Sequence, residues 1–193
     1  MANKVLVLEM DSTPDQITFA DFGGDFSPTA ANDLRHVSAV DTEVQLTLAS
    51  LADGAARQST KVDLGSLRAR EYHVRAAFEM AATPTTGDII ELYWAPSQHA
   101  TAGTGNAANV TGADGAYAGY AANLAASVLQ LIYIGAFVCT VQVTATVQVA
   151  EVGVFSPPER YGSLIVKNES NAAFHNDDVE SHVVFDPIIP EIQ

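Results

Sequence analysis

Thr140-Val-Gln-Val-Thr-Ala-Thr-Val-Gln-Val149 is the stretch that most clearly indicates how this chain folds. Apolar residues occupy one parity, which comprises Val141, Val143, Ala145, Val147 and Val149. Neutral polar residues occupy the other, which comprises Thr140, Gln142, Thr144, Thr146 and Gln148. Side chains of a strand point to alternate faces, so this pattern predicts a strand with one apolar face and one neutral polar face. Such a half-buried strand is typical of a β-sandwich or barrel.

Other segments repeat the alternation, most clearly Glu71 to Met80 and Asp88 to Ala95. The residues expected to face inward are Tyr72, Val74, Ala76, Phe78 and Met80 in the first segment, and Ile90, Leu92 and Trp94 in the second. Further strands are predicted at residues 5–8, 16–20, 43–48, 133–139, 160–167 and 181–185. We therefore predict an all-β fold, a jelly-roll-like antiparallel β-sandwich.

The prediction for domain organisation is a single domain over residues 1–193. Its end, from about residue 186 to 193, is expected to be an extended tail, because proline cannot donate to a strand ladder. Pro96 to Ala118 lacks periodicity and is predicted to be a long loop that wraps a neighbouring subunit. One short helix is predicted between Tyr120 and Ile132, where apolar residues recur at helical spacing.

Composition excludes several classes of function. The 193 residues include 23 acidic and 9 basic side chains, for a formal net charge of −14. Duplex nucleic-acid binding needs a basic patch and docking on anionic lipid needs positive charge, so we expect neither partner. We expect no secretory signal, and no stretch reaches the roughly 18 apolar residues of a transmembrane helix. The single cysteine, Cys139, is predicted to be a small buried hydrophobic residue.

Charge is missing from a large part of the chain. No Lys or Arg occurs between Arg75 and Arg160, and Asp114 is the only acid after Glu91 and before Glu151. Free surfaces normally mix charges of both signs, whereas the centres of protein interfaces are depleted in charge. The sequence therefore predicts a subunit interface, although a simply neutral, loop-rich surface is the alternative. The candidate interface residues are Thr140, Gln142, Thr144, Thr146, Gln148, Tyr117 and Tyr120.

Most of the basic residues lie between Arg57 and Arg75, where acids also occur at Asp63 and Glu71. A nucleic-acid contact and a solvated or partner-facing strand edge both remain open for this segment, and the intervening acids favour the strand edge.

We find no strong catalytic or metal-binding pattern, and expect no enzyme activity, no cofactor and no metal. Ser97 and His99 beside Asp88 lack the nucleophile-elbow sequence of a hydrolase. Gly103-Thr-Gly105 lacks the lysine of a phosphate loop. The best metal candidate is the acidic turn that His175 and His182 flank, which holds Asp177, Asp178 and Glu180; a solvated acidic turn is the alternative.

The second half of the chain resembles small structural proteins of tailed-bacteriophage virions. The resemblance lies in Gly87-Asp-Ile-Ile-Glu-Leu-Tyr-Trp-Ala-Pro-Ser97, Thr111-Gly-Ala-Asp-Gly115, Pro158-Glu-Arg-Tyr-Gly-Ser-Leu-Ile-Val-Lys-Asn168 and Phe185-Asp-Pro-Ile-Ile-Pro-Glu191. It implies a jelly-roll-like sandwich, no enzymatic activity and assembly on a phage particle. It carries over no catalytic residues. An acidic, cysteine-poor chain also suits a protein made in the reducing host cytoplasm before it enters the virion.

Three functions follow as expectations. The first is a capsid decoration (cement) protein. It would bridge neighbouring subunits of the major capsid protein and would itself form a trimer or another cyclic homo-oligomer. The second is a tail, neck or baseplate component. The third is a receptor- or glycan-binding module that uses Trp94, Tyr117 and Tyr120 as an aromatic platform.

Overall fold

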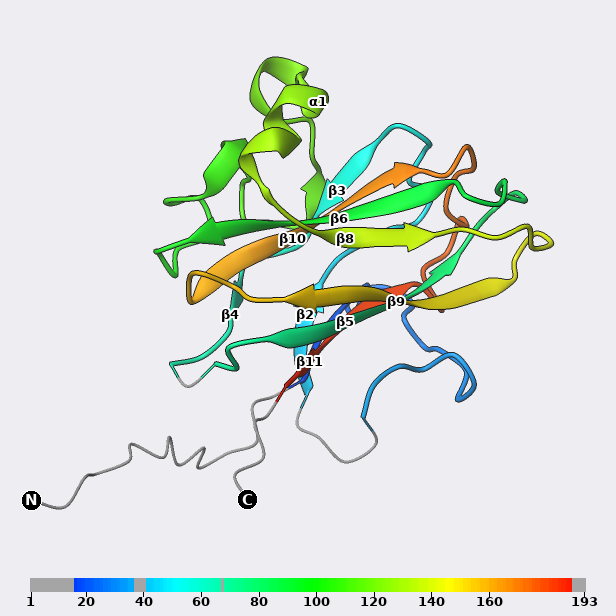
Figure 1. Ribbon diagram of the computed structural model, residues 1–193, viewed down its shortest axis with the longest axis horizontal. Helices are drawn as coiled ribbons and strands as arrows, with labels where there is room; N and C mark the ends of the chain where they lie inside the picture. The colour runs from blue at the N-terminus through cyan, green and yellow to red at the C-terminus, as the bar shows by residue number, and fades with distance from the viewer. Residues whose placement is uncertain (1–15, 37–40, 67, 189–193) are drawn as a thin grey trace, which may run out of the picture.

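Two β-sheets pack face to face in the computed structural model, which describes residues 16–36, 41–66 and 68–188 (Figure 1). Sheet A has the order β2-β1-β11-β5-β9, with strands Asp41–Gln45, Gln16–Ala20, His182–Pro187, Tyr72–Glu79 and Val147–Phe155. Sheet B has the order β7-β3-β10-β6-β8, with strands Gly115–Ala116, Ala56–Gln58, Tyr161–Glu169, Ile89–Ser97 and Ile132–Val138. The short β4 (Val62–Asp63) also pairs with β10. The prediction of an all-β sandwich is confirmed.

Antiparallel pairing joins the strands, with one exception in the described residues. β1 and β2 run parallel, with Gln16 opposite Asp41 and Ala20 opposite Gln45. A tight hairpin cannot join two parallel strands, and residues 21–40 connect this pair. The sandwich is therefore antiparallel in all but this edge pair.

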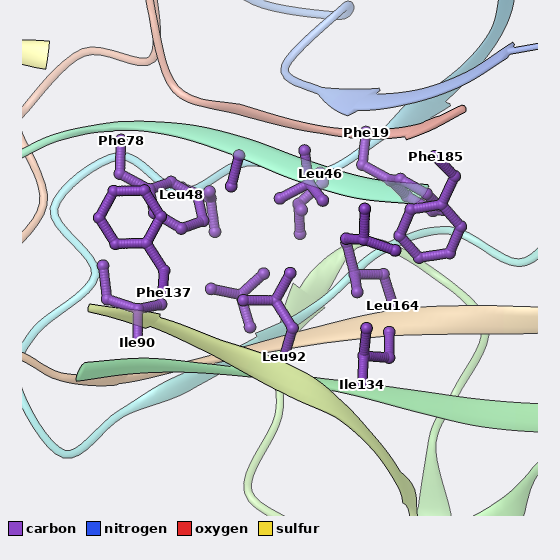
Figure 2. Close-up of a cluster of buried hydrophobic side chains, with 14 of the residues drawn as sticks. Phe19, Leu46, Leu48, Phe78, Ile90, Leu92, Ile134, Phe137, Leu164 and Phe185 are labelled. Carbon is purple, nitrogen blue, oxygen red and sulfur yellow. The ribbon is translucent and has the colours of Figure 1, made fainter. Parts of the chain in front are cut away.

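The core lies between the two sheets, where the alternating strands direct their apolar side chains (Figure 2). Both inward-facing sets predicted from the sequence are confirmed, since every member is buried. Trp94 lies at the centre of an aromatic group, 5.5 Å from the Phe155 ring and 5.9 Å from the Phe185 ring. At the other end, Phe78 contacts the rings of Phe137 and Phe174 edge-on. Aromatic pairs with these geometries add stability beyond the area that they bury.

β8 of sheet B and β9 of sheet A approach each other along one side of the sandwich (Figure 1). At Gly135 the backbones are so close that a Cβ atom would lie 2.5 Å from the Val152 carbonyl oxygen. Only glycine fits at this point. The two edge strands therefore nearly close this side of the sandwich.

The stretch Thr140–Val149 is not one strand, so the prediction for it is wrong over its first seven residues. β8 ends at Val138 and β9 begins at Val147, in the other sheet, so the chain crosses between sheets where a strand was predicted. A turn at Ala145, with a φ of 58°, makes this crossing. The faces are also reversed, because Gln148 is buried and Val149 is exposed.

The predicted loop Pro96–Ala118 and predicted helix Tyr120–Ile132 cover the outer face of sheet B. Ala108, Val110, Tyr117, Val128 and Leu131 form a second apolar cluster with Tyr93, Ala95 and Ile165 of that sheet. The helical part is short, with α1 at Leu124–Ser127 and the 3-10 turns η1, η2 and η3 at Ala107–Asn109, Tyr120–Ala122 and Val128–Gln130. The apolar residues of the loop are thus buried against its own sheet, and the prediction that it wraps a neighbour is not needed to explain them.

The predicted C-terminal tail is wrong for its first two residues. Asp186 and Pro187 belong to β11, opposite His73 and Tyr72 of β5. Pro187 is tolerated at the end of the strand, where the ladder no longer needs its N–H. The predicted strand over residues 5–8 and the last five residues of the chain lie outside the described residues.

Cys139 confirms its predicted burial, with none of its surface exposed. Burial, with a smaller contribution from the charge of Asp88, raises the pKa of its thiol to about 11. Because the thiolate is the reactive form, we expect iodoacetamide to label the native protein at pH 8 more than about 100-fold more slowly than the urea-unfolded chain. Equal labelling rates, measured by mass spectrometry, would contradict the burial.

Candidate functional site

Most of the large apolar side chains that remain exposed gather on one side of the sandwich. Six of them lie on β8, on the crossing that follows it and on β9: Tyr133, Val138, Val141, Val143, Val149 and Val154. We call these six residues and the backbone that carries them the β8–β9 edge. Val143, at the end of the crossing, is 73% exposed. Exposed apolar residues concentrated on two neighbouring strands in this way are typical of a surface that a partner covers.

The buried side chain of Gln148 holds the start of the crossing at Thr140 in place. Its side-chain oxygen accepts a hydrogen bond from the Thr140 backbone N–H at 2.8 Å, and its side-chain nitrogen donates to the Thr140 carbonyl at 3.1 Å. The amide thus replaces the backbone partner that Thr140 would have in a sheet. A hollow of about 270 Å³ opens beside it, lined by Phe137, Val138, Thr140, Gln142, Val147, Gln148, Val149 and Ala150.

Charge is nearly absent from this edge. From Gly115 to Ala150 the sequence contains no Asp, Glu, Lys, Arg or His. The exception on β9 is Glu151, whose side chain is 76% exposed and whose carboxylate lies 3.6 Å from the His73 ring. Both strands are sheet edges, and natural edge strands usually carry charges that prevent pairing with other chains. Apart from Glu151, the β8–β9 edge lacks that protection.

The seven residues predicted for the interface divide into two groups. Thr140, Gln142, Thr144 and Tyr120 are exposed, and Thr146 is half-buried. Gln148 and Tyr117 are buried within the chain, and the Tyr117 hydroxyl donates to the Ala108 carbonyl at 2.8 Å. The sequence pattern missed the exposed valines and Tyr133, because strict alternation assigned Val141, Val143 and Val149 to the core. The role of these residues in an interface stays a prediction.

Basic residues of the Arg57–Arg75 segment pair with acids of the same chain. Arg57 contacts Asp114 at 3.1 Å, and the guanidinium of Arg75 bonds Asp186. Asp63, in the same segment, bonds Arg160 at 2.6 Å. These ion pairs connect segments that are distant in the sequence, which gives these charges a structural role inside the molecule.

The triad of Ser97, His99 and Asp88 does not assemble. Ser97 ends β6 and Asp88 precedes its first residue, and a nine-residue strand separates its ends by roughly 25 Å. The Ser97 hydroxyl accepts a hydrogen bond from Lys61 Nζ at 3.0 Å. The same ammonium group donates to the carbonyls of His99, Thr101 and Thr104, and so holds the loop that follows β6. The His99 ring makes no hydrogen bond to Ser97 among the described contacts. An open hollow of about 430 Å³ lies beside this loop.

The residues of the acidic turn that were predicted as a metal site do not all converge either. The Asp178 carboxylate accepts a hydrogen bond from the Leu48 backbone, and both oxygens of Glu180 accept from the Thr29 N–H at 3.2 Å. His182, on β11, is fully buried, and its ring accepts a hydrogen bond from the Leu34 N–H. Only His175 and Asp177 remain together, with Nδ1 and Oδ1 3.2 Å apart. Glu79 of β5, which no sequence pattern singled out, joins them.

Burial and a hydrogen bond from the Leu34 N–H keep the His182 ring in its neutral form. Its Nδ1 donates to the Glu180 carbonyl at 2.8 Å, which leaves Nε2 to accept from the Leu34 N–H at 3.1 Å. Burial lowers the pKa of this ring, against smaller contributions that include the Glu180 contact and the charge of Asp33. Protonation would place a second N–H against the Leu34 donor.

We therefore expect this ring to reduce stability in acid. Below a pH of about 6.5 the unfolded chain takes up a proton that the folded ring excludes, so the free energy of unfolding falls by up to about 1.4 kcal/mol per pH unit until the lowered folded pKa is reached. In urea titrations between pH 5 and 7.5, the difference between the wild type and His182→Asn isolates this ring. Parallel curves for the two proteins would contradict the assignment.

The aromatic platform of the glycan-binding alternative does not form, because Trp94 and Tyr117 are buried and only Tyr120 is exposed. No helix in the described part of the chain is both long and apolar enough to cross a bilayer. No protein-family model matches the chain, and neither the curated proteins nor the solved structures contain a match.

Proposed function

We propose that this protein is a non-enzymatic structural component of a bacteriophage particle, a capsid decoration protein that assembles with copies of itself through the β8–β9 edge. The observation that carries the proposal is the exposed, almost uncharged apolar surface formed by β8, β9 and their connection. The sequence resemblance to virion structural proteins supplies the biological setting.

The net charge restricts where copies of this chain can meet. At −14, two copies repel each other over most possible contacts, because like charges brought together without water are unfavourable. A contact through the β8–β9 edge instead buries valines and Tyr133, and Glu151 is the one acidic residue of β8, β9 and their connection. The same surface repeated around a closed ring gives a trimer or another cyclic oligomer.

Purified virions test the location. We expect the protein to co-purify with phage heads in hundreds of copies, the number that the resemblance implies for a decoration protein, quantified on a gel against the major capsid protein. Cryo-electron microscopy should then place it on the outer shell. Its absence from the heads would overturn the assignment.

A tail, neck or baseplate component is the alternative that uses the same surface. Ring-shaped assemblies in those parts of a phage would bury an uncharged edge equally well. The gel separates a head protein from neck and baseplate parts, which are expected in far fewer copies than the capsid protein. A tail-tube protein is the ambiguous case for copy number, so heads and tails must also be separated. Recovery with isolated tails, in place of heads, would favour the alternative.

A further inference from the structure

Three potential metal ligands converge where β5 ends. Glu79 is the last residue of β5, and His175 and Asp177 lie in the segment that leads into β11. One ligating atom from each lies within 4.8 Å of the others. These residues come from parts of the chain almost one hundred positions apart.

Backbone contacts fix this meeting point. The His175 N–H donates to the Glu79 carbonyl at 2.9 Å, and Phe174 forms a bridge with Met80. The Glu79 N–H donates to the Ser181 hydroxyl at 3.2 Å, and the His175 carbonyl accepts from the Ser50 N–H at 2.7 Å. The ligand-bearing backbone is thus held from both sides, and the side chains need no loop closure to meet.

The Glu79 carboxylate is the observation that points to a ligand. The residue is only 8% exposed, and its carboxylate makes no hydrogen bond or ion pair with any described residue. A carboxylate that is largely removed from water and has no protein partner is costly. Burial raises the pKa of Glu79, and the charges of Asp177 and Glu180 raise it further, against an opposing contribution from His175.

His175 adds a second unsatisfied atom. Its Nδ1 is buried and makes no hydrogen bond within the described residues, although Asp177 Oδ1 lies only 3.2 Å away. Ligands of a tetrahedral zinc ion are about 3.3 Å apart, since each lies about 2.0–2.2 Å from the metal. The nitrogen and the oxygen are thus already at the spacing that a shared ion requires, and a Glu79 oxygen lies within 4.8 Å of a ligating atom of each residue.

We propose that Glu79, His175 and Asp177 form a binding site for a divalent transition-metal cation, Zn²⁺ being the best fit. One imidazole and two carboxylates suit Zn²⁺ better than Ca²⁺ or Mg²⁺, which prefer all-oxygen sites. Three protein ligands leave a fourth position for water. The ion would join the end of β5 to the segment before β11 and so stabilise the centre of sheet A.

The test is isothermal titration calorimetry of the full-length protein, freed of metal with a chelator and titrated with ZnCl₂. We expect one saturable Zn²⁺ site per chain, and weaker binding of Ca²⁺ and Mg²⁺. A saturating concentration of Zn²⁺ should also raise the melting temperature by about 5–10 °C. Absence of saturable Zn²⁺ binding, or tighter binding of Ca²⁺ than of Zn²⁺, would overturn the proposal.

Glu79→Gln is the decisive variant, because it keeps the shape of the side chain and removes its charge. We expect Zn²⁺ affinity to fall about 100-fold or more, since even groups that only orient metal ligands change affinity 10- to 100-fold. Glu180→Gln is the matched control. Glu180 is buried to a similar degree, but both its oxygens already bond the Thr29 N–H. Equal Zn²⁺ affinity in Glu79→Gln and wild type would assign binding to other surface histidines and overturn the site.

Discussion

Val149→Asp is expected to weaken self-association about 100-fold or more. Val149 is exposed on β9, next to the hollow that Gln148 lines, and so lies within the β8–β9 edge. If a second copy covers this edge, the new carboxylate loses water without gaining a partner, and a cost of about 3 kcal/mol corresponds to roughly 100-fold in affinity. Sedimentation velocity over a range of protein concentrations measures the change.

Val149→Lys separates apolar burial from long-range charge. Lysine brings the net charge closer to zero, so it would strengthen association if repulsion between copies controlled the affinity. We expect it to weaken association as aspartate does, because either charge loses its hydration in the contact. Stronger association in Val149→Lys would contradict an apolar interface at this position.

Ala116→Asp is the matched control for both variants. Ala116 is exposed on β7, which is the opposite edge strand of sheet B. A charge there leaves the β8–β9 edge untouched, so association should be unchanged. All three variants should melt close to the wild type, because substitutions of exposed side chains usually change stability by less than about 0.5 kcal/mol.

Gly162→Ala is expected to cause a large loss of stability although it adds a single carbon atom. A Cβ atom at Gly162 would lie 2.3 Å from the Trp94 ring, which the Phe155 and Phe185 rings confine. Overpacking a filled core typically costs about 1–3 kcal/mol, which lowers the melting temperature of a chain of this length by about 5–10 °C. Circular dichroism during heating measures the shift.

Two comparisons make the Gly162 prediction specific. Gly115, also in a strand of sheet B, has open space where its Cβ would lie, so Gly115→Ala should leave stability nearly unchanged. Trp94→Phe shortens the ring that blocks Gly162, and the Trp94 N–H has no hydrogen-bond partner to lose within the described residues. The double variant should therefore be more stable than the sum of the single effects. Strict additivity would contradict the contact.

Alternation predicted strand faces well where both neighbours of a strand were also strands of the same sheet. β5 pairs with β11 and β9, and β6 pairs with β10 and β8, and the inward residues of both strands were predicted correctly. A period of two is a local property, and it persists along any segment that stays in one sheet. The sandwich class could be predicted for this reason.

The same pattern failed at Thr140–Val149 because it contains no signal for a change of sheet. The chain leaves β8 at Val138 and enters β9 at Val147, and Ala145 adopts left-handed backbone geometry that its residue type does not favour. Tertiary structure determines this crossing. The charge-poor composition of the region still pointed to the side of the molecule where exposed apolar residues gather, although it named different side chains.

The alternation of apolar and polar residues also could not predict which residues are buried on the outer face of sheet B. Tyr93 and Ile165 have outward parity, yet both are buried, because residues 107–131 fold back over them. Glu79 was missed for a related reason. A polar residue at an outward position of a strand looks solvated in the sequence, and its partners His175 and Asp177 meet it only through the fold.

Hydrogen exchange of the wild-type protein, compared between dilute and concentrated solutions, tests the central claim most directly. If copies cover the β8–β9 edge, peptides spanning residues 132–154 gain protection as concentration rises, and peptides covering β2 and β7, the opposite sheet edges, do not. Unchanged exchange over residues 132–154, or protection confined to the β2 and β7 edges, would contradict it.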